Sequence, residues 1–201
     1  MDTMYTRRTV LALGGASLLA LAFPMPALAL TEGQARGLID GLVGEINSVI
    51  ASGKSERAMY TDFERIFRTY GDIPYIAAYA LGNDGRTATA AQKKAFSDAF
   101  TGYISRKYGK RFREFIGGRL EVQSVKAVKN YYEVQTTAFL RGTSPFTVSF
   151  HVSDRTGRPL LFNLFIEGVN MLLTERTEVG AMLDRRRGNI DALIQDLRTA
   201  S

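Results

Sequence analysis

The chain has 201 residues, of which 45% are hydrophobic and 23% are charged, and its formal net charge is +6. This length and composition predict one globular domain with a sizeable core and exclude a disordered chain. The chain has no cysteine and a single histidine, His151. Disulfides, thiolate catalysis and metal sites built from several histidines are therefore excluded, and we expect no metal, no cofactor and no nucleic-acid partner.

The first 29 residues have the features of a cleaved signal peptide. Arg7 and Arg8 precede an apolar run over residues 10–22, and residues 27–29 read Ala-Leu-Ala, the form of a signal peptidase site. The run is too short to span a membrane comfortably, and prolines end it. We therefore predict export of a mature domain of residues 30–201. The arginine pair also resembles a twin-arginine signal, so both export routes stay open.

The mature chain begins with two predicted helices. Thr31 and Gln34 fit a capping box before an apolar pattern of helical period, which Gly53 ends. Ser55 can cap a second helix with an apolar stripe that continues to about Tyr70.

Two further helices of different character follow. Asp72 and Pro74 begin a short helix that carries no charge over residues 75–81, so we expect it in the core or at the wall of a pocket. Residues 82–88 are predicted to form a loop. Thr89 and Gln92 then make a second capping box for a long helix. One stripe of that helix carries Phe96, Ala99, Phe100, Tyr103, Ile104, Tyr108, Phe112 and Phe115.

From Gly117 the apolar period changes from 3.6 to 2, which predicts four strands joined by short turns. The turns lie near residues 129–130, 142–145 and 154–159, so the strands should form an antiparallel meander. In the fourth strand, alternation predicts Leu160, Phe162, Leu164 and Ile166 on one face. Helices over about 170–187 and 189–197 close the chain. The predicted fold class is α+β, with N-terminal helices, a four-stranded antiparallel meander sheet and C-terminal helices.

No motif in the chain indicates an enzyme. His151 lies on the polar face of its predicted strand, but the chain has no G-x-S-x-G elbow to supply a nucleophile. Glu167 could be a buried general base with a raised pKa, or it could lie at a strand end and bind backbone amides or an arginine. Phosphate loops and dinucleotide fingerprints are absent from the sequence.

Several short motifs carry a resemblance to one family. They are Tyr103-Ile104-Ser105-Arg106-Lys107-Tyr108 with Arg111-Phe112, Ile166-Glu167-Gly168-Val169-Asn170 followed by Arg176, and Gly188-Asn189-Ile190-Asp191-Ala192-Leu193-Ile194. Over about residues 31–199 the chain resembles the toluene-tolerance or Mla C-component family of periplasmic phospholipid-binding proteins. That family typically has V-E-G-V-S and then a Y-R-S/T-x-F helix. Here Ile166 and Asn170 replace the valine and the serine, and Thr174-Glu175-Arg176 stands in place of the Y-R part.

The resemblance implies a lipid carrier. Such a protein holds phospholipid acyl chains in an apolar cavity between sheet and helices, and passes lipid between an outer-membrane lipoprotein complex and an inner-membrane transporter of the ATP-binding cassette type. A related branch is associated with hopanoid biosynthesis, so the lipid class stays open. We expect the cavity wall to contain Ile73, Ile76, Tyr79, Phe100, Tyr103, Ile104, Val134, Val148, Phe150, Phe162, Leu164 and Ile166. A basic face around Arg106, Lys107, Lys110 and Arg111 is the candidate for docking a partner.

Two other classes of function remain open from the sequence. The first is a small-molecule enzyme that uses His151 or Glu167 as a base in a small closed pocket. The second is a structural adaptor that has no cavity. Stoichiometric lipid in the purified protein would separate the carrier from both.

Overall fold

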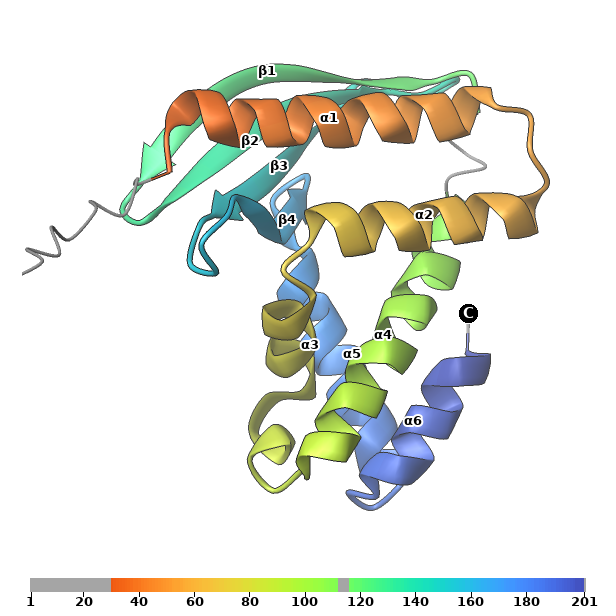
Figure 1. Cartoon of the computed structure of the whole chain (residues 1–201). Coiled ribbons are helices and arrows are strands. Elements are labelled where there is room, and N and C mark those ends of the chain that lie inside the picture. Colours follow the sequence, from red (N-terminus) through yellow and green to blue (C-terminus); the bar gives the residue numbers. More distant parts are fainter. Residues whose placement is uncertain (1–29, 112–115, 201) are drawn as a thin grey trace, which may run out of the picture.

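The computed structural model describes residues 30–111 and 116–200 (Figure 1). The predicted signal peptide lies outside the described residues, as do Phe112 and Phe115 of the aromatic stripe. In chain order the elements are α1 (Glu32–Ala51), α2 (Glu56–Tyr70), α3 (Ile73–Leu81), the 3-10 helix η1 (Gly82–Arg86), α4 (Ala90–Arg111), β1 (Arg119–Val128), β2 (Tyr131–Phe139), β3 (Phe146–Ser153), β4 (Leu160–Ile166), β5 (Val169–Asn170), α5 (Met171–Arg185) and α6 (Ile190–Thr199).

The helices begin where their capping residues predict. The Thr31 hydroxyl accepts a hydrogen bond from the Gln34 backbone N–H at 3.2 Å, and the Gln34 side chain accepts one from the Thr31 N–H at 3.0 Å. At the starts of α2 and α3, the side chains of Ser55 and Asp72 accept hydrogen bonds from the backbone N–H groups of Ala58 and Tyr75. These side chains satisfy backbone donors that a helix start leaves free. Residues 82–86 depart from prediction, because they form the 3-10 helix η1 rather than an irregular loop.

The sheet is antiparallel in the order β1-β2-β3-β4-β5, so it has five strands where the sequence predicts four. The additional strand arises at Glu167 and Gly168, whose φ angles are 49° and 81°. Two successive residues with positive φ form the kind of tight turn that joins hairpin strands. The turn sends the chain back along β4, so that Val169 pairs with Ile166 before α5 begins.

A bulge changes which side chains of β4 face inward. The pairing of β3 with β4 shifts between His151 and Val152, so Val152 pairs with Leu161 and Phe162 is the extra residue. Leu161 therefore lies with Leu164 and Ile166 against the inner core. The ring of Phe162 lies instead near those of His151 and Tyr131, with centroids 5.7 and 5.4 Å away. The predicted shared face of Leu160, Phe162, Leu164 and Ile166 is wrong for Leu160, because Leu161 takes its place in the inner core and simple alternation takes no account of a bulge.

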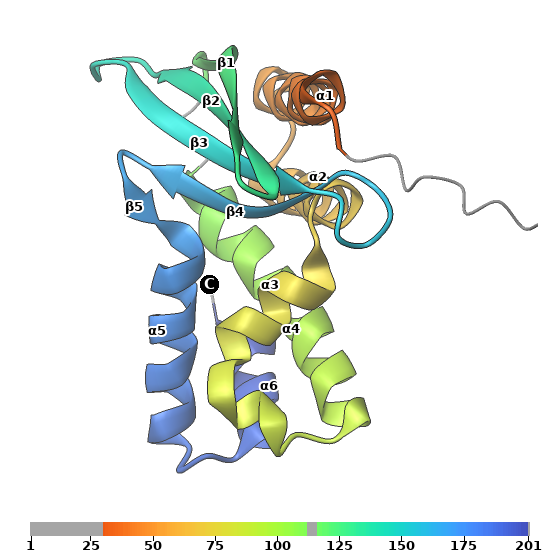
Figure 2. The ribbon, with the colours of Figure 1, turned by 90° about the vertical axis from the view of Figure 1, so that its left-hand side faces the viewer.

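The elements form two layers, with α1, α2 and the sheet above α3, α4, α5 and α6 in Figure 2, and each layer contains a hydrophobic core. The first lies between α1, α2 and the inner face of the sheet, and includes Ile39, Leu42, Ile46, Phe63, Ile66, Val134, Val148, Phe150 and Val152. The second lies among α3, α4, α5 and α6, and includes Ile76, Leu81, Phe96, Phe100, Val179, Leu183, Leu193 and Leu197. Burial of each such side chain contributes about 1.5–3 kcal/mol to folding, so both cores contribute substantially to stability.

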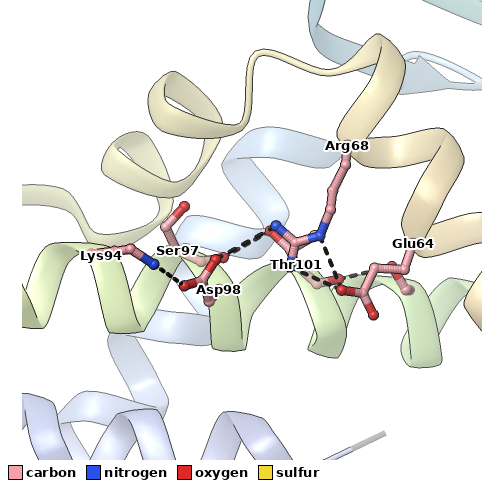
Figure 3. A network of polar contacts seen from close by, with 7 residues as sticks. Glu64, Arg68, Lys94, Ser97, Asp98 and Thr101 are labelled. Atoms are coloured by element: carbon pink, nitrogen blue, oxygen red, sulfur yellow. Dashed lines mark hydrogen bonds and ion pairs between the residues drawn. The ribbon is translucent and has the colours of Figure 1, made fainter.

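The two cores are joined through α2 and α4. Arg68 of α2 donates to Glu64 at 2.9 Å and lies 3.6 Å from Asp98 of α4, which also accepts from Lys94 (Figure 3). These charged groups are largely exposed, so each pair contributes little to stability. They accompany an extensive close approach of the two helices.

A second connection ties the start of α3 to the sheet. The buried Asp72 donates its backbone N–H to Leu161 O at 2.7 Å. The Arg155 guanidinium lies 3.5 Å from the Asp72 carboxylate, and it stacks on the rings of Tyr75 and Phe162 at 3.8 and 4.4 Å from their centroids. Cation–π contacts of this kind favour a fixed position for the β3–β4 turn against α3.

Within the described residues, no helix combines the length and apolarity needed to cross a membrane. The same part of the chain holds no cluster of three or more histidine, aspartate and glutamate side chains that could bind a metal ion.

Candidate functional site

A cavity of about 620 Å³ lies where the two cores meet. Helices α1 and α2, the inner face of the sheet, and helices α3, α4 and α5 all contribute to its wall. Its lining is mostly apolar and includes Leu42, Ile46, Phe63, Ile66, Ile76, Phe100, Ile104, Val148, Phe150, Leu161, Leu164 and Ile166. The volume falls in the range of small-molecule sites, and so large an apolar space left unfilled would be costly in a protein core.

The cavity reaches the surface at the end nearest the β2–β3 loop. Residues 143–145 of that loop and Glu167 of the β4–β5 turn line the cavity and are exposed to solvent. Two large apolar side chains next to this opening are also exposed, Val169 at 54% and Leu173 at 49%. The opening therefore combines polar loop atoms with exposed apolar side chains.

Eight of the twelve residues predicted for the cavity wall line the cavity. They are Ile76, Phe100, Ile104, Val148, Phe150, Phe162, Leu164 and Ile166. Whether they bind a ligand stays a prediction. The other four lie elsewhere. Val134 is buried in the first core, Tyr103 is buried in the second, and Tyr79 packs at the edge of the second beneath Arg176. Ile73, in the first turn of α3, is outside the lining.

The prediction missed the contribution of α1 and α2, which supply Leu42, Ile46, Phe63, Ile66, Phe67 and Tyr70. The apolar stripes of these helices are visible in the sequence. A stripe identifies the buried face of a helix but does not separate residues that pack against other side chains from residues that border a space.

A polar cluster bridges α4 and α5 beside the cavity. Lys107 Nζ donates to Glu175 Oε1 at 2.8 Å and also to Glu178. Tyr108 donates its hydroxyl proton to Glu175 Oε1 and Tyr103 donates to Glu178 Oε1, both at 2.5 Å. Glu175 and Tyr108 line the cavity. These side chains link α4 to α5 in addition to the apolar residues that both helices contribute to the second core.

The charges of this cluster stabilise one another. Burial alone would lower the pKa of Lys107, but hydrogen bonds to Glu175 and Glu178 outweigh it and raise that pKa. Burial alone would raise the pKa of Glu178, but hydrogen bonds from Lys107 and Tyr103 outweigh it and lower the pKa. Burial raises the pKa values of Tyr103 and Tyr108. At neutral pH the cluster therefore holds a charged lysine, an ionised Glu178 and protonated tyrosines.

The two candidate catalytic bases lie apart from each other. His151 is buried, lies 3.5 Å from Glu133 and is outside the cavity lining. Glu167 is exposed in a turn, and its N–H donates to Thr147 O at 3.0 Å. Thr147 and His151 are four residues apart along β3, which corresponds to about 13 Å. Glu167 thus lies at a strand end, as one of its two predicted interpretations has it, and its side chain is not buried.

Two of the four residues of the predicted basic docking face, Arg106 and Lys107, are engaged inside the fold, whereas Lys110 is exposed and the side chain of Arg111 lies outside the described part of the chain. Arg106 donates to the backbone carbonyls of Leu197 and Ala200 at the end of α6, and Lys107 binds the two glutamates of α5. The expectation of a free basic surface is therefore wrong for these two residues. The helical pattern predicts that they lie outside the apolar stripe, but it cannot show that α5 and α6 cover them.

Comparisons with known proteins agree with this architecture. The family model described as MlaC protein matches residues 40–199. The chain belongs to the MlaC family. This confirms the resemblance seen in the short motifs.

A solved structure from Ralstonia solanacearum has the same fold. It is described as a phospholipid-binding protein in complex with a phospholipid, and it superposes with a TM-score of 0.70 at 16% sequence identity. The match covers 82% of this chain and 94% of the other. At this identity the likeness shows the fold, which in this MlaC protein is the α+β arrangement predicted from the sequence.

Proposed function

We propose that this MlaC protein is a periplasmic carrier that holds the acyl chains of a phospholipid in its apolar cavity. The observation that carries the proposal is the cavity itself, about 620 Å³ with a mostly apolar lining and an opening to solvent. The phospholipid bound to the Ralstonia solanacearum protein of the same fold supports it.

The energetics of the cargo explain why such a cavity is needed. Two sixteen-carbon chains have about 30 methylenes, and at about 0.8 kcal/mol each their exposure to water would cost ~24 kcal/mol. An apolar cavity offers the chains an environment comparable to a bilayer, so transfer between the two is nearly balanced. Binding then gives transport no direction. We infer that direction comes from partners, an inner-membrane transporter of the ATP-binding cassette type and an outer-membrane lipoprotein complex.

The proposal includes export and a non-enzymatic role. Residues 1–29 would be removed as a signal peptide to leave a lipid-binding domain of residues 30–201. The separation of His151 from both Glu167 and the cavity supports a role in binding rather than in catalysis. A hopanoid or another lipid is the alternative cargo.

Native mass spectrometry of residues 30–201, purified without detergent, tests the carrier function. We expect an added mass that matches a diacyl lipid and is released on denaturation. Added mass of a different lipid class would replace the phospholipid with that cargo. A bare protein that also takes up no lipid from vesicles would overturn the proposal.

Substitutions in the cavity wall test where the lipid lies. Ile76→Asp and Phe150→Asp each place a charge at a buried lining position, so both should lower co-purified lipid per folded protein. Ala78→Asp and Thr147→Asp are matched controls, because these residues are exposed on the same helix and the same strand. Since a buried charge can prevent folding, Ile104→Trp narrows the cavity without one. Unchanged lipid in all three lining variants would contradict this placement.

A further inference from the structure

The cavity wall contains one carboxylate oxygen without a hydrogen-bond partner. Glu175 is 3% exposed, and it lines a cavity whose other lining is mostly apolar. Its Oε1 accepts from Lys107 and Tyr108, whereas its Oε2 is buried and has no partner in the described part of the chain. An unpaired oxygen of this kind is costly, and buried polar groups in folded proteins are nearly always paired.

Glu175 lies near the part of the cavity where the polar end of a bound lipid would lie. Met171, one helical turn earlier on α5, lines the cavity, and the exposed Glu167 lies at the opening. Four residues of helix advance about 6 Å. Glu175 therefore lies about one turn below the N-terminal end of α5, on the side of the cavity that opens to solvent, where the glycerol and headgroup of a tail-inserted lipid would lie.

The charge of the cluster selects the kind of group that would bind. Two carboxylates, Glu175 and Glu178, share one ammonium, that of Lys107. Further acceptors would be repelled by this arrangement, whereas an N–H or O–H donor would both satisfy Oε2 and meet a favourable potential.

We propose that Glu175 forms a polar subsite in the cavity wall, which accepts a hydrogen bond from an N–H or O–H donor in the polar part of the bound lipid. This rests on the proposed carrier function and adds a basis for headgroup selection. An ethanolamine ammonium and a glycerol hydroxyl are two donors of this chemistry that common bilayer lipids offer. Choline has the same charge as ethanolamine but no N–H, so it separates hydrogen bonding from charge attraction.

Competition between headgroups tests the subsite. Lipid-free protein of residues 30–201 is incubated with vesicles that contain equal amounts of phosphatidylethanolamine, phosphatidylglycerol and phosphatidylcholine with identical acyl chains, and the bound lipids are quantified by mass spectrometry. We expect about tenfold enrichment of a donor-bearing lipid over phosphatidylcholine, the typical effect of one hydrogen bond to a charged group. Enrichment of phosphatidylethanolamine identifies the ammonium as the donor, and enrichment of phosphatidylglycerol identifies the hydroxyl.

In the Glu175→Gln variant, the enrichment among the lipids that it binds should be reduced at least severalfold. Glu178→Gln is the matched control, because Glu178 belongs to the same cluster but lies outside the cavity lining. This variant should keep the enrichment of the donor-bearing lipid over phosphatidylcholine. Equal binding of the three lipids by the unaltered protein, or enrichment that survives in Glu175→Gln, would overturn the subsite. Absence of lipid from every sample would instead contradict the carrier function itself.

Discussion

At the scale of single residues, the burial of His151 has a consequence for pH dependence. The imidazole is 8% exposed, and its ring centroid lies 4.7 Å from those of both Tyr131 and Phe165. Burial lowers the pKa of His151, and the nearby carboxylate of Glu133 opposes this without overcoming it. The folded protein therefore holds His151 neutral at a pH where the unfolded chain already protonates it.

The first prediction concerns the stability of the protein between pH 7.5 and 5.5. As the pH falls through the ordinary histidine value of about 6.5, the unfolded chain binds a proton before the folded one, so stability is lost. One group contributes at most about 1.4 kcal/mol per pH unit, which corresponds to a fall in melting temperature of about 3–5 °C. Calorimetry at several pH values measures this slope.

Replacing the titrating ring provides the control for that slope. His151→Gln keeps a polar side chain beside Glu133 but cannot be protonated, so its melting temperature should vary less with pH over the same window. The carboxylate of Glu178, whose pKa is lowered, loses its stabilising effect only below about pH 4.5 and does not interfere. An identical slope in the variant and the unaltered protein would show that His151 is not its source.

At single residues, local features could be predicted from the sequence, whereas features that depend on distant elements could not. Thr31, Ser55 and Asp72 could be identified as caps because capping depends on neighbours within four residues. The inward position of Leu161 in place of Leu160 could not be predicted, because it depends on how β4 pairs with β3. The hydrogen bonds of Arg106 and Lys107 are made to α6 and α5, which lie about 70–90 residues later in the chain, so neighbouring residues do not predict them.

At the scale of elements, α2 and α4 approach each other closely at one glycine. A Cβ placed on Gly109 of α4 would lie 2.3 Å from Cδ1 and 2.8 Å from Cε1 of the Tyr60 ring on α2. Because the first of these ring atoms is close to the Tyr60 backbone, a small rotation of the side chain cannot relieve the clash. This contact lies beside the cavity, which Gly109 also lines.

The second prediction is that Gly109→Ala destabilises the protein. Overpacking of this kind typically costs about 1–3 kcal/mol, which exceeds the gain of about 0.5–1 kcal/mol expected from alanine inside a helix. Gly180→Ala is the matched control, because Gly180 lies inside α5 and a Cβ there would have no neighbour within 4 Å among the described residues. Chemical denaturation should show Gly109→Ala less stable and Gly180→Ala slightly more stable than the unaltered protein. Equal effects of the two substitutions would show that the Tyr60 contact imposes no constraint.

The elements themselves could be predicted from the sequence, and their spatial arrangement could not. Over residues 30–111 and 116–200, all six α-helices and four of the five strands follow from the period of apolar residues and from turn residues. The two-residue strand β5 is too short to produce a period, and only its pairing with β4 across the turn at Glu167 and Gly168 reveals it. The lining of the cavity could be predicted only in part. A buried side chain that borders a space has the same sequence pattern as one that borders another side chain.

At the scale of the whole molecule, the cavity separates two cores that are otherwise joined mainly through α2 and α4. Leu42, Ile46 and Phe150 face the cavity from the first core, and Ile76 and Phe100 face it from the second. A lipid in the cavity would contact both sets at once. The ligand would then replace apolar contacts that the protein alone cannot make across the space.

The third prediction is that the proposed lipid couples the stability of the two cores. A ligand that binds only the folded state at 100 times its Kd adds about 2.7 kcal/mol, so delipidated protein should melt at a lower temperature. Because the ligand contacts both cores, its removal should also lower amide hydrogen-exchange protection in α1 and in α4 alike. Exchange measured by mass spectrometry on loaded and delipidated protein gives this comparison. A loss of protection confined to one core would place the ligand against that core alone and contradict a site built from both. A loss in both cores would show that the bound lipid completes the packing between them.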